Sequence, residues 1–307
     1  MSRISSAMIP MSALSDLSRA QQELVEASRQ SSAQTKASDM KGYGRQAQTL
    51  VSAQRMVART EGFLSTGAEL QTRMQLQDVS LGRAADVISS LKDSLFQNIG
   101  LEDGNGVRAA LEDAFSVLKD AMNTTLGGRY LFGGVLNDRP PVTADSLSDL
   151  AANPLSDAIV QGADAQQIRI EDEKTVKAGV VADDVIADAL GILQRLAQFD
   201  EGVDGPFGGD MTETQKTAIQ SEMDNLSKAF DHVLQAQAEN GRLLNEVESA
   251  TKRQEGRRDA LNAAVGDIVN VDLGEVAVRL NQAQFAYQAS ASVFNTLRNL
   301  TLINFLD

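Results

Sequence analysis

The C-terminal tail of the chain has regularly spaced apolar positions. In "VDLGEVAVRLNQAQFAYQASASVFNTLRNL", apolar or small residues recur in alternating steps of three and four. This spacing places side chains along one face of an α-helix and is typical of coiled-coil packing. The positions on this face are Leu273, Val276, Leu280, Ala283, Tyr287, Ser290, Phe294 and Leu297. The tail is therefore predicted to be a long helix that needs a surface to pack against.

Other segments repeat this spacing. Near the N-terminus, Leu14, Leu17 and Leu24 form a stripe on a first helix that Pro10 is expected to break or restart. Further helices are predicted over about 46–99, 107–126, 183–199 and 219–268. In the last of these, polar residues such as Asn240 and Gln254 interrupt the apolar positions. Such interruptions indicate either bundle packing with a selected register or a surface for a partner.

The middle of the chain has a different pattern. "GGRYLFGGVLNDRPP" is rich in Gly and Pro, and its Tyr-Leu-Phe core predicts a short strand between turns, while "QQIRIEDEKTVKAGVV" alternates apolar and polar residues as strands do. The predicted fold is mainly α: an elongated bundle of long helices with coiled-coil-like terminal helices and a small β-containing insertion. The predicted domains are an N-terminal assembly helix (1–42) pairing with a C-terminal one (266–307), a helical rod (43–128 and 182–265) and a small β-rich insertion (129–181).

Composition narrows the possible functions. The formal charge of −14 argues against nucleic-acid binding and disfavours anionic membranes, because both need a basic face. The absence of Cys removes disulfides, thiolate chemistry and Cys-ligated zinc. No stretch approaches the about 20 apolar residues that a bilayer span needs. The N-terminus does not resemble a cleaved secretory signal, so export would need another route.

Candidate chemistry is sparse. His232 is the single histidine and sits beside an apolar position of a long predicted helix, which favours a surface role over catalysis. "DEGVDGPFGGD" lacks the spaced ligands of a calcium loop, and "GGRYLFGG" lacks the Lys-Ser/Thr pair of a phosphate-binding loop. No nucleophile triad or dinucleotide-binding fingerprint is present. The sequence therefore predicts a protein that is not an enzyme, with no catalytic residue, no cofactor and no metal.

The apolar face of the C-terminal helix leaves two possibilities. Ordering so long a helix costs backbone entropy that its own hydrogen bonds only partly recover, so the isolated tail should fray. It could fold back on the protein's own body, or neighbouring copies could cover it. The pattern alone does not decide between them.

Two segments carry a resemblance to a known family. The tail "VDLGEVAVRLNQAQFAYQASASVFNTLRNLTLINFLD" resembles the C-terminal helix of the flagellin superfamily. "GGRYLFGGVLNDRPPV" is similar to the corresponding segment of the hook-associated protein 3 family, the proteins of the hook–filament junction. The resemblance spans essentially the whole chain. The segment "SRQSSAQTKASDMKGYGRQAQ" departs from both patterns, so a flagellin-like minor filament subunit stays an alternative, and a non-flagellar secreted helical adaptor is a second one.

The resemblance implies a structural role outside the cell, in the bacterial flagellum, after type III export without a cleaved signal peptide. It implies a ring of copies between hook-associated protein 1 and flagellin, with an export chaperone holding the C-terminal helix before assembly. In this family the terminal helices form an inner layer that neighbouring subunits complete. The predicted assembly residues are Leu14, Leu17, Leu24, Leu273, Val276, Leu280, Tyr287, Phe294 and Leu297.

Overall fold

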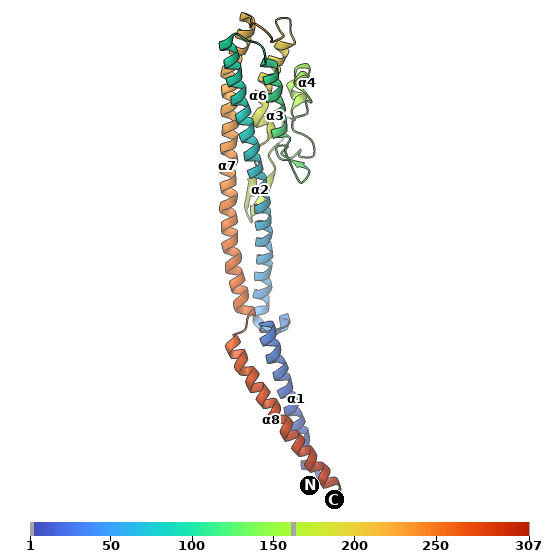
Figure 1. Cartoon of the computed structure of the whole chain (residues 1–307). Coiled ribbons are helices and arrows are strands. Elements are labelled where there is room, and N and C mark those ends of the chain that lie inside the picture. Colours follow the sequence, from blue (N-terminus) through green and yellow to red (C-terminus); the bar gives the residue numbers. More distant parts are fainter. Residues whose placement is uncertain (1–2, 161–163, 307) are drawn as a thin grey trace. The chain divides into compact units, whose positions relative to one another are not determined.

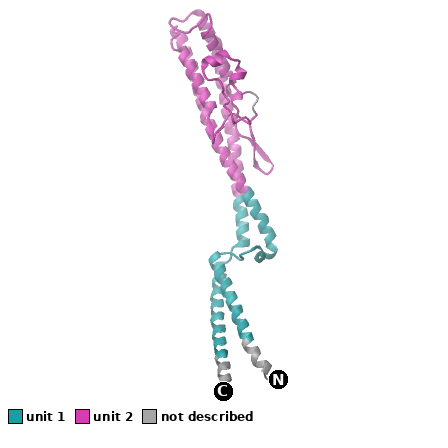
Figure 2. Cartoon of the chain, turned by 90° about the vertical axis from the view of Figure 1, so that its right-hand side faces the viewer, with its two compact units in different colours: residues 1–59, 257–307 teal, residues 60–256 magenta. Residues whose placement is uncertain are grey.

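The computed structural model describes residues 3–160 and 164–306 of the chain. The described part is mainly helical, with two small two-stranded sheets, as the sequence predicts. It divides into two compact units, one of residues 1–59 with 257–307 and the other of residues 60–256 (Figure 2). None of the described helices is long and apolar enough to cross a membrane.

The first unit is built on the two terminal helices. Helix α1 (Arg3–Ala33) packs against α8 (Leu273–Leu306), and the end of α1 lies beside the start of α8, where Val271 N–H donates to the Gln34 carbonyl at 3.2 Å (Figure 1). The two helices are therefore antiparallel. The predicted break at Pro10 is wrong: α1 continues through this position. Pro10 lies beyond the first turn of α1, so the helix continues there at the cost of one backbone hydrogen bond.

The segment that follows α1 bonds to the segment that precedes α8. Lys36 donates its backbone N–H to the carbonyl of Val269 at 2.8 Å, and Thr35 pairs with Asn270 as an antiparallel bridge. The Lys36 ammonium also donates to the carbonyl of Asp267 at 2.7 Å. The segment after α1 then forms a short 3₁₀ helix, η1 (Met40–Gln46), which Asp39 caps by accepting from Gly42 N–H.

Two helices longer than fifty residues run through both units. Helix α2 spans Ala47–Leu101 and α7 spans Glu213–Val269, close to the predicted bounds. In the second unit they pack antiparallel: Asn240 of α7 donates to the carbonyl of Met74 of α2 at 2.9 Å, and Gly67 lies against Thr251. Asn240 is fully buried, so the predicted bundle packing with polar interruptions is confirmed at this residue.

The remaining helices of the second unit cover one side of α2 and α7. Helix α3 (Val107–Met122) and α6 (Ala182–Asp200) pack on each other, and the short α4 (Leu147–Ala152) and α5 (Leu155–Ala158) pack on α6 (Figure 1). Their buried faces join those of α2 and α7 in one apolar core. This core consists mostly of aliphatic side chains, as expected from the scarcity of aromatic residues.

Two hairpins complete the second unit. Strands β1 (Thr125–Leu126) and β2 (Arg129–Tyr130) pair antiparallel, as do β3 (Gln167–Glu171) and β4 (Lys174–Lys177). The β3–β4 hairpin lays Ile170 and Val176 on a second small core between α2 and α7.

The predicted Tyr-Leu-Phe strand is only partly right, since β2 ends at Tyr130 and the chain turns there. Leu131 and Phe132, which follow, are buried in the larger core. Positive φ values at Gly127, Gly128 and Gly134 fit glycine and produce the turns around this segment. Helix α3 ends at Met122 instead of near 126, because Thr125 and Leu126 join the hairpin.

Candidate assembly surface on the terminal helices

The contact between α1 and α8 is made largely by small residues. On α1, Ala13, Ala20 and Ala27 are buried and recur every seven residues, while Leu17 and Leu24 between them are partly buried. Alternating steps of three and four keep these side chains on one helical face. We call this face and its counterpart on α8 the inner seam.

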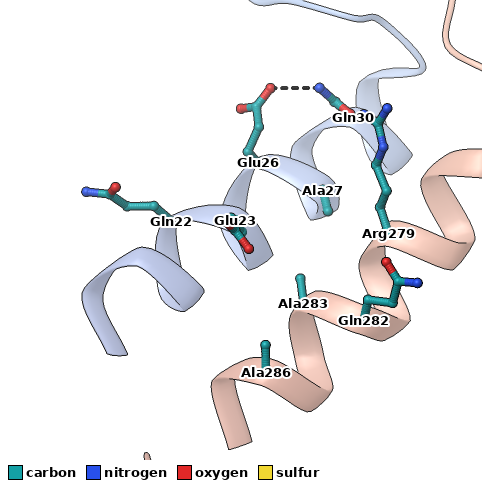
Figure 3. Close-up of a pocket in the computed structure, with 9 residues that line it drawn as sticks. All are labelled: Gln22, Glu23, Glu26, Ala27, Gln30, Arg279, Gln282, Ala283 and Ala286. Atoms are coloured by element: carbon teal, nitrogen blue, oxygen red, sulfur yellow. Dashed lines mark hydrogen bonds between the residues drawn. The ribbon is translucent and has the colours of Figure 1, made fainter. Parts of the chain in front are cut away.

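On α8 the inner seam follows the predicted register. Val276 and Ala283 are buried, and Leu280, Tyr287, Phe294 and Leu297 are partly buried. Ala27 of α1 and Ala283 of α8 face each other across the gap between the helices (Figure 3). Small facing residues allow the helices to approach closely but bury little apolar area for each residue.

Polar side chains border the inner seam beside this alanine pair. A hollow of about 500 Å³ is lined by Glu26 and Gln30 of α1 and by Arg279 and Gln282 of α8, among others. Gln30 donates to Glu26 at 3.0 Å (Figure 3), and Arg29 pairs with Glu26 at 2.7 Å. The hydrogen bond from Arg29 lowers the pKa of Glu26 below its usual range. The border is therefore polar and charged, and ion pairs at such exposed positions add little to stability.

Several large apolar residues of both helices lie outside the inner seam and are exposed. On α8, Val278 and Phe285 are seven residues apart and project from the side opposite Leu280, with Phe285 75% exposed. On α1, Met11 is 74% exposed. We call the whole set the outer stripes: Met11, Leu14 and Val25 on α1, and Leu273, Val278, Phe285 and Val293 on α8. Leu273 shares the face of Leu280 but lies at the first residue of α8, where it is exposed.

The structure divides the nine predicted assembly residues between these two surfaces. Seven belong to the inner seam within one chain, and two, Leu14 and Leu273, belong to the outer stripes with about half of their surface exposed. Sequence reasoning missed Met11, Val25, Val278, Phe285 and Val293, although the seven-residue spacing of Val278 and Phe285 was a usable signal.

Catalytic chemistry finds no support in the described residues. His232 of α7 lies with its Nδ1 at 2.6 Å from an Asp188 carboxylate oxygen of α6, and both side chains are half exposed. Such a pair is typical of a helix surface. Among residues 3–160 and 164–306, no group of three or more His, Asp or Glu side chains could hold a metal ion.

Comparison with known proteins identifies the C-terminal region. Residues 223–306, which contain most of α7 and all of α8, match the family model of the bacterial flagellin C-terminal helical region. This region of the chain is of the flagellin C-terminal type. The match covers the α8 residues of both the inner seam and the outer stripes.

Solved structures show where the fold recurs. The chain superposes on a protein of Vibrio parahaemolyticus described as a flagellar hook-associated protein, with a TM-score of 0.59, 14% identity, and coverage of 73% of this chain and 97% of that one. Bacillus cereus FlgL gives a TM-score of 0.49 and 14% identity, with coverage of 65% and 98%. Because the Vibrio protein is only 14% identical to this chain, the comparison shows a shared fold and no more than that. No curated protein sequence matches the chain significantly.

Proposed function

We propose that this chain forms the junction between the hook and the filament of a bacterial flagellum, by self-assembly through α1 and α8. The observation that carries the proposal is the pair of outer stripes. They leave seven large apolar side chains exposed on two helices whose inner faces are already packed on each other. The flagellin-type C-terminal region and the fold shared with a protein described as hook-associated support the same reading.

The outer stripes are unusual for a surface that stays in water. Single exposed apolar residues are normal, whereas several along neighbouring helices mark interaction sites. Covering a side chain such as Phe285 or Met11 with apolar surface contributes on the order of 2 kcal/mol. The inner seam, built on alanines, needs such additional burial. Neighbouring copies are the natural cover, because each copy offers the same stripes.

The proposed partners follow from this position. Copies would form a ring, with hook-associated protein 1 on one side and flagellin on the other, and an export chaperone would hold α8 before assembly. Export would proceed without a cleaved signal peptide. In the proposed division of labour, residues 1–42 and 266–307 assemble, 43–128 with 182–265 form the rod, and 129–181 form a small insertion.

Two other functions compete with the junction. A flagellin-like minor filament subunit would use the same outer stripes along the filament length. A non-flagellar secreted helical adaptor would use them on another protein or leave them bare. Imaging a tagged copy separates these functions, because a single band at the hook, a signal along the filament and no flagellar signal are three distinct outcomes.

The role of the outer stripes is tested by changing them alone. The double variant Val278→Ser with Phe285→Ser alters two exposed side chains, so the purified monomer should keep its helicity and melting temperature. In cells that lack the unaltered protein, this variant should fail to join the flagellum. The matched control is Gln288→Ser on the exposed side of the same helix, which should assemble.

The inner seam gives a contrasting result. Ala20→Gln places a long side chain between α1 and α8 and should loosen the first unit even in the monomer, whereas Ser18→Gln adds the same side chain to an exposed position. Normal assembly by the Val278→Ser, Phe285→Ser variant would contradict the proposal. So would a loss of monomer helicity in that variant, since it would make the outer stripes part of the internal packing.

A further inference from the structure

A cavity in the second unit has a polar lining with positive charge. It measures about 600 Å³ and lies between α2, the β1–β2 hairpin and the segment that leads into β3. This volume is in the range of small-molecule sites. Its lining includes Gly127, Arg129, Leu131 and Asn137, all from the segment "GGRYLFGGVLN". No role in assembly accounts for this cavity.

Arg73 of α2 extends into this region with donors that the protein does not use. Its Nη2 donates to the carbonyl of Leu131 at 2.8 Å, which anchors the side chain. Its Nε is buried and has no hydrogen-bond partner among the described residues. Burial lowers the pKa of Arg73, and the positive charge of Arg129 lowers it further, while Glu69 acts in the opposite direction. A buried donor without a partner is costly, and because this Nε is shielded from solvent, a ligand in the cavity would meet Arg73 through the other atoms of its guanidinium group.

The charges that line the cavity are unbalanced. Arg73 and Arg129 contribute two positive charges and Glu69 one negative charge, in a chain whose formal charge is −14. Within the part of the chain that the structure describes, neither arginine forms an ion pair. Elsewhere in the second unit, arginines such as Arg195 are paired with carboxylates. Two arginines that share a cavity repel each other unless an anion lies between them.

A third side chain also lacks a partner. Asn137 lines the cavity and is only 9% exposed, and its amide makes no hydrogen bond to any described residue. Its backbone carbonyl accepts from Tyr130 N–H at 3.0 Å, which fixes the residue beside the β1–β2 hairpin. Thr66 and Gln166 add a hydroxyl and an amide to the same lining. The amide atoms are not themselves shielded from solvent, so they are open to a ligand in the cavity.

We propose that this cavity binds a small organic anion. Its carboxylate or phosphate group would lie between Arg73 and Arg129, because guanidinium groups bind planar or tetrahedral oxyanions with two hydrogen bonds. Hydroxyl groups on the same ligand would bond to Asn137 and Gln166. The site differs from a phosphate-binding loop, since side chains and not a run of backbone N–H groups supply the donors.

The proposal is tested on the full chain by titration calorimetry with three probes of similar size. Glucuronate carries a carboxylate, glucose 6-phosphate carries a phosphate, and glucose carries no charge. At least one of the two anions should bind saturably at one site, and glucose should not bind. Binding of only glucuronate would assign a carboxylate ligand, and binding of only glucose 6-phosphate would assign a phosphate ligand.

Variants locate the binding. Arg129→Gln changes an exposed side chain and should weaken binding about tenfold by removing a charge-assisted contact. Asn137→Ala should weaken it as well. Arg139→Gln, an equal charge change outside the lining, should leave the affinity unchanged. The proposal is overturned if neither anion binds, or if Arg129→Gln and Arg139→Gln bind as tightly as the unaltered chain. Because α1 and α8 take no part, failure here leaves the assembly proposal intact.

Discussion

Arg108 at the start of α3 donates to the carboxylate of Asp200 at the end of α6 at 2.6 Å. Asp200 is nearly fully buried, and its other oxygen accepts from Phe207 N–H at 2.6 Å. The pair therefore joins two helices and the loop that follows α6. A buried carboxylate with these two donors depends on both of them.

Arg108→Met should destabilise the second unit by about 2 kcal/mol, because it leaves the buried Asp200 charge without its cation. The value is at the low end for a buried pair, since Arg108 is 42% exposed and water can replace part of the contact. Urea unfolding followed by circular dichroism measures the effect. Glu112→Gln, which removes one of the two exposed carboxylates beside Arg108, should stay within about 0.5 kcal/mol of the unaltered chain. Equal losses in the two variants would refute the role of Asp200.

Two glycines close together in sequence should respond in opposite directions. A Cβ on Gly104 would lie 2.8 Å from the backbone nitrogen of Gly208, so Gly104→Ala should destabilise by about 1–3 kcal/mol through overpacking. Gly100 lies in α2 with nothing near its Cβ position, so Gly100→Ala should stabilise by about 0.5–1 kcal/mol through helix propensity. Thermal melts of the two variants test the contrast, and a shift of the same sign in both would contradict it.

The long helices were predictable because their apolar spacing extends over many turns. Errors in single residues hardly affect such a pattern, so the bounds of α2, α6 and α7 agree with the sequence to within a few residues at their clear ends. The helices α4 and α5 were not predicted, since each is too short to show a period and depends on packing against α6.

The candidate surfaces were predictable only in part. The register of α8 gives the inner seam, but periodicity cannot tell which apolar face the other terminal helix covers. Phe285 and Met11 emerge as exposed only when the alanines of α1 are seen to lie in the contact. Likewise, the cavity beside Arg73 joins residues far apart in the chain, such as Arg73, Asn137 and Gln166, and no local pattern brings them together.

The buried amide of Asn240 should set the register between α2 and α7 at a cost in stability. It donates to the Met74 carbonyl at 2.9 Å, while its own Oδ1 is buried without a partner among the described residues. Asn240→Leu removes that unpaired oxygen and should raise stability by about 1 kcal/mol. Asn240→Asp buries a carboxylate against the Met74 carbonyl, which is an acceptor, and should lower stability by about 3 kcal/mol at neutral pH. Chemical denaturation measures the free energy of unfolding of both variants. A destabilised Asn240→Leu variant would mean that the hydrogen bond to Met74 contributes more than the unpaired oxygen costs.

The ion pair between α6 and α7 should make stability depend on pH in acid. Arg195 donates twice to Glu222, at 2.7 Å to each oxygen, and Asn225 donates at 2.9 Å. These hydrogen bonds, Arg195 first, lower the pKa of Glu222 from its ordinary 4.5, against the opposing effect of burial. A carboxylate whose pKa is lower in the folded state than in the unfolded state binds its proton more weakly when folded. Its contribution is therefore complete above about pH 4.5 and is lost as the pH falls through the lowered value.

Glu222→Gln should consequently lower stability most near neutral pH. The difference from the unaltered chain should shrink as the pH falls below 4.5, the ordinary pKa of the group. Arg195→Met supplies the control. Without the guanidinium, the pKa of Glu222 loses its largest lowering contribution and keeps only that of Asn225, so the acid-dependent part of the stability difference should shrink. Urea unfolding between pH 7 and pH 3 measures the free energy of unfolding of the unaltered chain and of both variants. If Glu222→Gln and the unaltered chain lose stability in parallel over that range, the Arg195–Glu222 pair does not contribute to acid sensitivity.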